Sequence, residues 1–410
     1  MQSLNENIQR IAKQSPYYKK QLAHLAIESL SFPEDLNQLP FTHKEDLSQY
    51  NADFLSIAKE EVRDWVTTSG TMGDPVWFAL SEKDLNRLAK NEAGSYRLAG
   101  LKRGQKVLLT TTMDRRFMAG LAYFFGGREY GLSFIRNGPG IPEMQWDSIR
   151  LMQPDLIIAV PSFLLKIAEY ARANGFNPSQ SSLKKAICIG ENIRNEKLEP
   201  NELALRIAAE WPGLELIGTY AGTEMSTAFT ECTQARGMHL QEDLIYAEFL
   251  NELNEPVAEG ELGELVITHL GVEAMPLIRF RTGDLMRHYR SKCPCGNPSL
   301  RIGPVEGRKQ QMIKYKGTTL YPPALFNVLH ESSEIQNFQI HLFRNQTGTD
   351  ELHIWVGFEG NPELILPLLK NRFKAKIRVS PIIKQMEIEV IEKSKWPEKN
   401  RKALLFIDHR

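Results

Sequence analysis

The sequence is poor in cysteine, carries no net charge and contains no long apolar run, and each absence excludes a class of protein. Four cysteines in 410 residues are too few for the disulfide framework of a small secreted protein. Lys and Arg together number 50, as do Asp and Glu, so no overall charge favours nucleic acid or anionic lipid. No apolar stretch reaches the length of a membrane span, and the N-terminal MQSLNENIQRIAKQSPYYKK has no signal-peptide core. We therefore expect a cytoplasmic protein whose partners are recognised at local sites.

The hydrophobic pattern predicts two domains. The composition, 42% hydrophobic and 24% charged, is typical of globular proteins. Between about residues 107 and 268, short runs such as DLIIAV, AICIG and ELVITH alternate with segments of helical period such as PSFLLKIAEYARANG. This alternation predicts a large α/β domain, residues 1–304, built on a largely parallel sheet covered by helices on both faces.

After Gly303 the pattern changes to that of a small α+β domain, residues 305–410. We expect a helix at residues 324–330, a β-hairpin formed by NFQIHLFR and ELHIWVGF, a helix in PELILPLLKNRFKAKI and a final strand in QMEIEVIE. A unit of roughly 100 residues can hold a core of its own. The boundary is expected near IGPVEGRK.

Three turns combine glycine with hydroxyl or carboxylate side chains. The loop TTSGTMGDP, residues 67–75, suits phosphate oxygens through its N–H groups and hydroxyls, although it lacks the order of a Walker loop. In GTYAGTEMS, residues 218–226, a strand leads to Thr223 and Glu224, and a carboxylate there suits Mg²⁺ on ATP phosphates. In MPLIRFRTGDL, Asp284 follows a strand and can accept ribose hydroxyls. Taken singly, each is equally well explained as a turn or a helix cap.

The order of the motifs is more specific than any one of them. TTSGTMGDP, CIGEN, YAGTE, RFRTGDL, the basic GRKQQMIKYKG and a lysine near the C-terminus resemble, in this order, the motifs of the adenylate-forming enzymes: acyl-CoA synthetases, luciferases and peptide-synthetase adenylation domains. Within that superfamily, SPYYKK, LPFTHKEDL and MPLIRFRTGDL are most similar to the phenylacetate-CoA ligase family. The resemblance covers nearly the whole chain. It implies a large domain of mixed or parallel sheets covered by helices, and a small, mobile α+β domain.

The resemblance implies nucleotide-binding roles in the large domain. Contacts with the β- and γ-phosphates of ATP are implied for Ser69, Gly70, Thr71 and Gly73. The adenine would be lined by Gly190, Glu191 and Asn192 and stacked on by Tyr220. Thr223 would contact the α-phosphate, Glu224 would hold Mg²⁺, and Asp284 would bind the ribose.

Further roles are implied in the small domain. Arg308 would assist at the ribose, and Gln310 would lie at the hinge about which this domain rotates. Gly317 would allow the pantetheine arm of coenzyme A to approach the backbone. Lys402 would approach the α-phosphate and the carboxylate, although Lys399 is a rival for this catalytic role.

The reaction implied by the resemblance is the ATP-dependent ligation of a small carboxylic acid to CoA. The carboxylate attacks the α-phosphorus of ATP, pyrophosphate leaves, and the CoA thiol then attacks the acyl-adenylate and releases AMP. Mg²⁺, loop amides and Lys402 would stabilise the developing charge. The aromatic DRRFMAGLAYFFGGREYG, residues 114–131, suits an aryl acid such as phenylacetate, or it is simply core. The alternatives are an adenylyltransferase and an amide-forming ligase with another acceptor. A homodimer is compatible with the sequence.

Four stretches of the sequence depart from the pattern of the family. Asp74-Pro75-Val76 stand where many relatives carry a lysine, which leaves one phosphate contact in doubt. Ala221 replaces a usual glycine, and Gln310-Gln311 replaces a commonly acidic pair. Lys402 follows an arginine where glycine is usual.

A candidate metal site is formed by Cys232, His239, Cys293 and Cys295. Three thiolates and one imidazole are a ligand set of closed, structural zinc sites. The two halves are far apart in sequence, so free thiols are the alternative. The CPCG turn and the basic GRKQQMIKYK would also fit a zinc-knuckle nucleic-acid-binding protein, but zero net charge and the motif series argue against it. Cys188, within an apolar run, is expected in the core.

Overall fold

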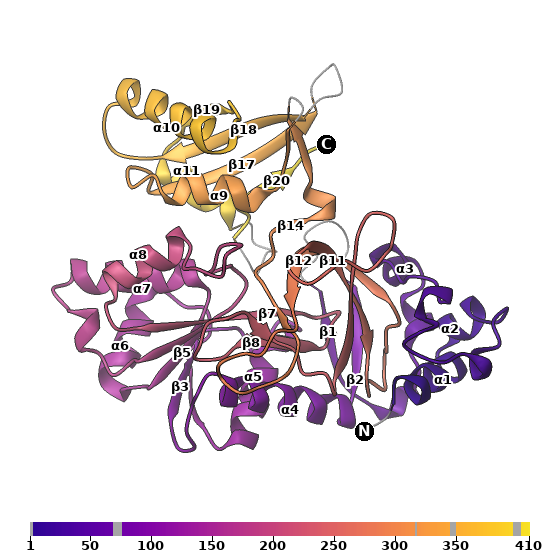
Figure 1. The fold of residues 1–410 in the computed structure, drawn as a ribbon. Helices are drawn as coiled ribbons and strands as arrows, with labels where there is room; N and C mark the ends of the chain where they lie inside the picture. The colour runs from indigo at the N-terminus through magenta and orange to yellow at the C-terminus, as the bar shows by residue number, and fades with distance from the viewer. Residues whose placement is uncertain (1–2, 69–75, 316–317, 345–349, 397–402) are drawn as a thin grey trace. The chain divides into compact units, whose positions relative to one another are not determined.

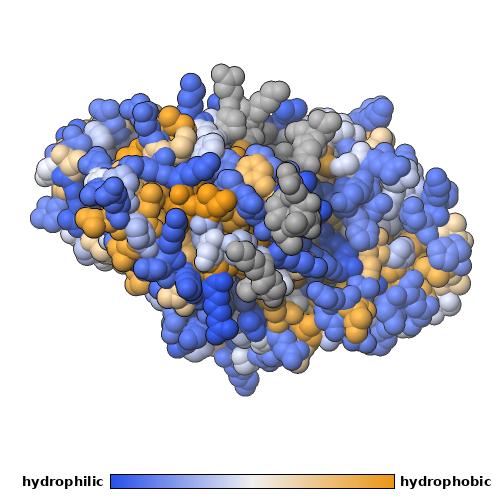
Figure 2. All heavy atoms as spheres, turned by 90° about the horizontal axis from the view of Figure 1, so that it is seen from above, coloured by the Kyte–Doolittle hydropathy of each residue, from blue (hydrophilic) through white to orange (hydrophobic). Residues whose placement is uncertain are grey.

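The computed structural model describes residues 3–68, 76–315, 318–344, 350–396 and 403–410 (Figure 1). The chain divides into two compact units, Met1–Pro304 and Val305–Arg410. Each unit has a hydrophobic core of its own. On the face seen in Figure 2, hydrophilic side chains predominate and apolar side chains form smaller groups. Among the described helices, none combines the length and the apolar character needed to cross a bilayer.

Five parallel strands form one half of the main sheet in the first unit. Strand β5 is buried on both faces, because every residue of Leu156–Ala159 is 0% exposed, and such strands read as continuous apolar runs. Helices α4 and α5 cover one face and α6, α7 and α8 the other. In sheet order the strands are β4 (Ser133–Arg136), β3 (Lys106–Leu109), β5, β6 (Lys185–Cys188) and β7 (Glu215–Gly222). The connecting helices are α5 (Met118–Tyr130), α6 (Pro142–Met152), α7 (Pro161–Ala173) and α8 (Glu202–Glu210).

The other half of the sheet is antiparallel, and the prediction of a largely parallel sheet is wrong for it. Strand β7 turns at residues 223–226 and pairs antiparallel with β8, and ELVITH lies in β11, antiparallel to both of its neighbours. No helix-length connection separates these strands, and a parallel pair requires one. The strands are β8 (Thr227–Glu231), β9 (Met238–His239), β10 (Ile245–Leu250), β11 (Leu262–His269), β12 (Phe280–Tyr289) and β13 (Arg301–Ile302).

Helix α4 (Glu82–Leu98) follows a hairpin of β1 (Val62–Thr67) and β2 (Trp77–Ser81). A capping box at Ser81 and Asp84 begins the helix, because each side chain accepts from the backbone N–H of the other. The helix packs closely on α5 at Gly126, where a Cβ would lie 2.3 Å from that of Glu92. This crossing therefore requires a glycine.

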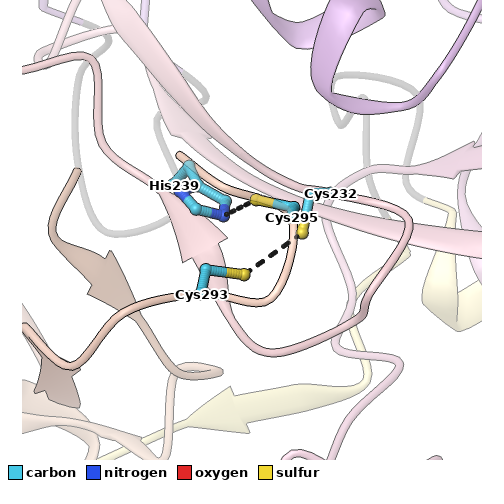
Figure 3. Close-up of side chains that lie close together, drawn as sticks. All are labelled: Cys232, His239, Cys293 and Cys295. Carbon is cyan, nitrogen blue, oxygen red and sulfur yellow. Dashed lines mark hydrogen bonds between the residues drawn. The ribbon is translucent and has the colours of Figure 1, made fainter. Parts of the chain in front are cut away.

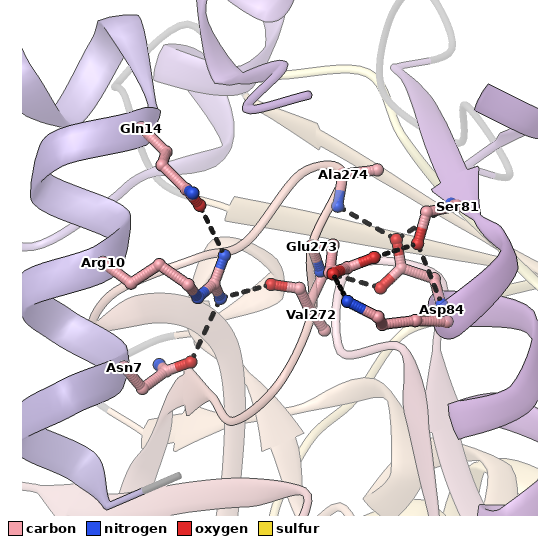
Figure 4. A network of polar contacts seen from close by, with 9 residues as sticks. Asn7, Arg10, Gln14, Ser81, Asp84, Val272, Glu273 and Ala274 are labelled. Atoms are coloured by element: carbon pink, nitrogen blue, oxygen red, sulfur yellow. Dashed lines mark hydrogen bonds and ion pairs between the residues drawn. The ribbon is translucent and has the colours of Figure 1, made fainter. Parts of the chain in front are cut away.

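The N-terminal helix α1 and helix α4 are both tied to the loop that precedes β12 (Figure 4). Arg10 donates to the carbonyl of Val272 at 2.6 Å. The Asp84 carboxylate accepts from the backbone N–H groups of Glu273 at 2.8 Å and Ala274 at 3.0 Å. Helices α1 and α4 thus hold the same loop. The N-terminal helices are α1 (Leu4–Gln14), α2 (Pro16–Gln21) and α3 (Lys44–Gln49).

The second unit is a four-stranded sheet with helices, in the order β19-β18-β17-β20. The predicted hairpin forms, but the strand predicted in QMEIEVIE is wrong, because residues 388–395 are helical. Ile388 and Ile391, three residues apart, lie against Gly357, which has no side chain to keep the helix away. Helical spacing on this sheet therefore outweighs the local alternation. The elements are β17 (Asn337–Arg344), β18 (Asp350–Gly357), β19 (Ile382–Gln385), β20 (Phe406–Asp408), α9 (Pro322–His330), α10 (Pro362–Ile377) and α11 (Ile388–Lys395).

Candidate active site and metal centre

Several predicted site residues lie outside the described part of the chain. The stem of the predicted phosphate loop is described: Thr68 donates its N–H to the carbonyl of Val76 at 2.8 Å, and the Val76 N–H donates to the Thr68 hydroxyl at 3.1 Å. These bonds join the two ends of the loop as a continuation of the β1–β2 hairpin. The predicted residues outside the described ranges are Ser69, Gly70, Thr71, Gly73, Gly317, Lys399 and Lys402.

Tyr220 and Asp284 meet although they are 64 residues apart in the chain. Tyr220 lies on β7 and Asp284 on β12, and the tyrosine hydroxyl donates to Oδ2 of the carboxylate at 2.6 Å. The N–H of Asp284 donates to the hydroxyl of Thr282 at 3.1 Å, across Gly283 with φ of +75°, a conformation that favours glycine. The RTGD turn thus directs a carboxylate at an aromatic ring on the other half of the sheet.

Glu224 lies in the turn between β7 and β8, and its side chain is 17% exposed. The Ser226 N–H donates to the Thr223 carbonyl at 3.2 Å, which closes the turn. From α4, Arg87 donates to the Ser226 carbonyl, and burial lowers the pKa of this guanidinium to about 10. The Lys44 Nζ lies 3.5 Å from Oε1 of Glu224. The buried Arg87 therefore holds the backbone of the turn. Lys44 lies next to the carboxylate of Glu224.

The segment GEN after β6 begins with Gly190, whose φ of +77° turns the chain. The Glu191 carboxylate accepts from the N–H of Ser162 at 2.8 Å and from its hydroxyl at 2.9 Å, at the start of α7. A carboxylate is favourable at a helix N-terminus. The Asn192 carbonyl accepts from the Asn201 amide at 2.8 Å. The adenine-lining role of this segment stays a prediction, and any contact by Glu191 would come from its backbone.

Cys232, His239, Cys293 and Cys295 lie together, with their ligand atoms all within 4.8 Å of one another (Figure 3). Cys232 follows β8, His239 lies on β9, and both other cysteines lie between β12 and β13. His239 pairs with Thr230 of β8 and with Arg301 of β13. The antiparallel half of the sheet therefore joins the two halves of the cluster.

Two distances within the cluster match those between neighbouring ligands of a tetrahedral zinc site. The Sγ atoms of Cys232 and Cys293 are 3.6 Å apart, and Sγ of Cys295 is 3.5 Å from Nε2 of His239. Zinc–ligand bonds of about 2.0–2.3 Å in a tetrahedron separate neighbouring ligand atoms by about 3.5–3.8 Å. The other ring nitrogen, Nδ1, is 2.9 Å from the Ser299 hydroxyl, the kind of contact that orients a histidine ligand. Burial and the nearby Arg301 lower the pKa of His239 to about 4.

In the second unit, an ion pair holds the segment that contains Gln310. Arg410 donates to the Met312 carbonyl at 3.0 Å and to the Asp350 carboxylate at 3.0 Å. The same carboxylate oxygen accepts from the Lys314 N–H at 2.7 Å. Gln310 lies in the short helix Lys309–Gln311. This helix directly follows strand β14 (Gly307–Arg308), which ends at Arg308. The roles of Gln310 and Arg308 stay predictions.

Comparison with known proteins identifies the family. No profile of a protein family matches the chain. The sequence is 30% identical over 378 residues to the phenylacetate-coenzyme A ligase of Pseudomonas putida, covering 89% of this chain and 84% of the relative. It is 31% identical over 341 residues to the phenylacetate-coenzyme A ligase of Thermus thermophilus, covering 81% and 75%. The chain belongs to the phenylacetate-CoA ligase family.

Solved structures show the same fold. A crystal structure of 2-hydroxyisobutyryl-CoA ligase in the postadenylation state matches with a TM-score of 0.85 and 24% identity, over 99% of this chain and 88% of that one. An anthranilate CoA ligase matches with a TM-score of 0.59 and 13% identity, over 88% and 77%. The predicted fold, family and enzyme class, an AMP-forming acid–CoA ligase that uses ATP and CoA, are confirmed.

Two cavities of the first unit lie apart from the residues expected to bind ATP in this family. Their volumes are about 490 and 460 Å³, and Arg10 and Glu273 line both. None of the described residues predicted to bind nucleotide lines either cavity. They belong to the polar network between the N-terminal helices and the sheet.

The segment LPFTHKEDL resembles the family, but this resemblance implies no role for Lys44. The structure places this lysine against Glu224. A signal was present in the sequence, because the predicted phosphate loop lacks the lysine that many relatives carry after its proline.

Proposed function

We propose that the chain activates a small aryl acid of the phenylacetate class as an acyl-adenylate and transfers the acyl group to CoA. The observation that carries the proposal is the contact of Tyr220 with Asp284 at 2.6 Å, beside the turn that bears Glu224. One aromatic ring, one hydroxyl acceptor and one metal-binding carboxylate are what an adenosine triphosphate needs at such a site. The substrate class rests on the relatives named phenylacetate-coenzyme A ligase and on the aromatic α5 segment.

Each predicted site residue has a separate task in this proposal. Asp284 accepts the ribose hydroxyls, and Tyr220, whose own hydroxyl bonds that carboxylate, presents its ring to the adenine. Thr223 donates its hydroxyl to the α-phosphate. Lys402 and the 69–75 loop bind the reacting phosphates in the proposal, and Gly317 admits the thiol arm of CoA. Gln310 is the hinge about which the small domain rotates, so that Lys402 acts in the first half-reaction and the segment of Gly317 in the second.

Magnesium fits the donor that Glu224 offers. Mg²⁺ takes hard oxygen ligands and is held by one or two carboxylates together with phosphates and water. The Glu224 carboxylate is partly exposed and so keeps an edge open to a ligand. When bound, Mg²⁺ would neutralise phosphate charge as a Lewis acid.

Zinc fits the Cys₃His cluster as a structural ion. Three sulfurs and Nε2 of His239 fill the four positions of a tetrahedron and leave none for a substrate. Cys232, His239 and Cys293 are at most 5% exposed, whereas Cys295 is exposed, so it is the filled coordination that would keep the ion from the reacting groups. Its proposed role is to fasten the loop after Cys293 to the strand pair β8–β9.

Pyrophosphate release, measured over a panel of aryl and fatty acids with and without CoA, tests the function. We expect phenylacetate-like acids to release pyrophosphate, and CoA thiol to be consumed in step with AMP. AMP formation without thiol consumption would instead favour an adenylyltransferase or an amide-forming ligase. Glu224→Gln should weaken the use of Mg·ATP about tenfold or more, whereas Glu215→Gln, at the other end of β7, should not.

Metal analysis of protein purified without added zinc tests the cluster. We expect about one zinc per chain in the wild type and a loss of that zinc in Cys293→Ala. Cys188→Ala is the matched control, because Cys188 lies in β6, outside the cluster. Wild-type protein without zinc would reject the proposed site.

A further inference from the structure

We propose that Lys44 supplies the cation for the pyrophosphate end of ATP that the 69–75 loop lacks. The inference rests on the proposed acyl-adenylate function and adds a residue to it. Lys44 begins helix α3 and belongs to none of the predicted nucleotide-binding motifs. Three observations support it: the anchoring of its backbone, its contact with Glu224, and the chemistry of the residues around it.

The backbone before Lys44 is fixed to strand β12, which carries Asp284. Thr42 donates its N–H to the Arg279 carbonyl at 3.1 Å, and its own carbonyl accepts from the Arg281 N–H at 3.0 Å. Its hydroxyl donates to the Ile278 carbonyl at 2.6 Å. Thr42 is 1% exposed, so these bonds are shielded from water. The segment is in effect a short parallel strand beside β12.

The start of α3 is set by its own cap. The Asp46 carboxylate accepts from the His43 N–H at 2.7 Å, which fixes the first turn of the helix at Lys44. Helix α3 also contacts β12. The direction in which the Lys44 side chain leaves the backbone is therefore determined by the same strand that positions the ribose carboxylate.

The neighbouring arginines are committed to other carboxylates. Arg279 forms an ion pair with Glu248 at 2.9 Å, and Arg281 forms one with Glu264. Both guanidinium groups also lie over the ring of Phe41, at 4.1 and 4.7 Å from its centroid. These arginines hold the segment in place, and Lys44 is the cation of the segment that faces Glu224.

The position of the Lys44 ammonium suits a phosphate that shares a metal with Glu224. Its Nζ is 3.5 Å from Oε1 of Glu224, and its side chain is 39% exposed. Neighbouring oxygens around an octahedral Mg²⁺ are about 3 Å apart, so a cation next to one ligand oxygen can reach the adjacent one. A lysine has a flexible stem and a compact charge. It can therefore turn from the carboxylate to a phosphate oxygen when Mg·ATP enters.

The effect of Lys44 on the reaction would be to stabilise the leaving group, pyrophosphate. As the α-phosphorus is attacked, negative charge moves onto pyrophosphate, and a fixed cation there lowers the barrier. In many relatives the phosphate loop itself supplies a lysine, but here Asp74-Pro75-Val76 stand at that place. Lys44 would restore the charge from a different part of the chain.

Calorimetric binding of Mg-pyrophosphate and of AMP tests the proposal without turnover. We expect Lys44→Gln to bind Mg-pyrophosphate about tenfold more weakly than the wild type and to bind AMP equally well, because AMP has no β- or γ-phosphate. Lys44→Arg should recover most of the loss. Lys83→Gln is the matched control: it removes a lysine paired with Glu273 at 2.5 Å and should change neither affinity.

The outcomes separate the two proposals. Unchanged Mg-pyrophosphate affinity in Lys44→Gln would overturn the role of Lys44, with the adenylate chemistry left standing. An equal loss of AMP and pyrophosphate binding would also overturn it, since the change would then be structural. A wild-type protein that binds neither ligand would overturn the proposed function itself. Retained AMP binding by Lys44→Gln shows that the variant is folded.

Discussion

Glu92 is a carboxyl group sealed between helices α4 and α5. One oxygen, Oε1, accepts from the Asn91 amide at 3.1 Å, while Oε2 has no hydrogen-bond partner among the described residues. Burial raises the pKa of Glu92 to about 7, against the smaller opposing effect of hydrogen bonds from Ser95 and Asn91. The folded protein therefore binds this proton more tightly than the unfolded chain does.

This raised pKa predicts how stability depends on pH. Below about pH 4.5, Glu92 is protonated in both the folded and the unfolded chain. Between about pH 4.5 and 7, only the folded protein keeps this proton, so the free energy of unfolding falls as pH rises through this window. Glu92→Gln removes the ionisation, and at pH 8 it should be more stable than the wild type by up to about 3 kcal/mol. Urea unfolding at pH 4.5 and pH 8 measures the difference, with the exposed Glu129→Gln as control. A variant that is less stable at pH 8 would contradict the prediction.

The site residues differ in how far the sequence could predict them. Asp284, Glu224 and the Cys₃His set stand in short motifs, so their chemistry is visible locally, although their roles in binding ATP and metals stay predictions. The Tyr220–Asp284 contact joins residues 64 positions apart, and Lys44 meets Glu224 across a still longer separation. No local pattern encodes such contacts, because they depend on which strands become neighbours.

The ion pair of Arg410 with Asp350 acts on a whole element, the hairpin of β15 (Ile313–Tyr315) and β16 (Thr318–Leu320). Arg410 bonds the carbonyl just before β15, and Asp350 bonds an N–H within it. Both side chains are at most 14% exposed. A guanidinium can make these bonds at once because its donors form a rigid fork. The pair therefore fixes the hairpin to the sheet of its own unit.

We expect Arg410→Gln to slow thioester formation from a supplied acyl-adenylate more than it slows pyrophosphate release. The hairpin carries the segment expected to meet CoA, whereas the first half-reaction relies on other groups. The two half-reactions are measured separately, and Arg410→Lys should recover only part of the rate because it lacks the fork. Arg372→Gln, which breaks the pair with Glu334 at 2.7 Å, is the control. Equal slowing of both steps would speak against a specific role.

Strands and helices were predictable where local pattern and tertiary environment agree. The buried runs of β5 and β6 and the helical period of α4 and α7 are examples. Strand β11 reads as a parallel strand because residues 263–269 are all buried, yet its short connections make it antiparallel. In QMEIEVIE, Ile388 and Val390 alternate as in a strand, whereas Ile388 and Ile391 share one face only in a helix, and the open surface at Gly357 accepts that face.

At the scale of the molecule, the Cys₃His cluster would link distant parts of the first unit. Cys232 and Cys293 are 61 residues apart. An ion bound by both closes a loop of that length and so restricts the unfolded chain, as a cross-link does. The binding free energy of the ion adds to the stability of the folded state.

Removal of the ion should therefore lower thermal stability. We expect a strong chelator to reduce the midpoint of unfolding by roughly 5 °C or more, and zinc but not magnesium to restore it. Cys295→Ser should show a low midpoint and little further response to the chelator. A chelator effect of the same size in Cys295→Ser as in the wild type would place the ion elsewhere.

The docking of the N-terminal segment on β12 has a consequence for how the enzyme is made. The hydroxyl of Thr42 bonds a carbonyl 236 residues later in the chain, and Arg279 bonds the carbonyl of Leu39 across 240 residues. The segment therefore leaves the ribosome long before its partner strand exists, and contacts of such separation form late and slowly. Until that strand has been synthesised, the apolar side chains around Thr42 stay exposed to solvent. Nascent chains that stop short of residue 280 should need a chaperone to protect the segment that contains Lys44.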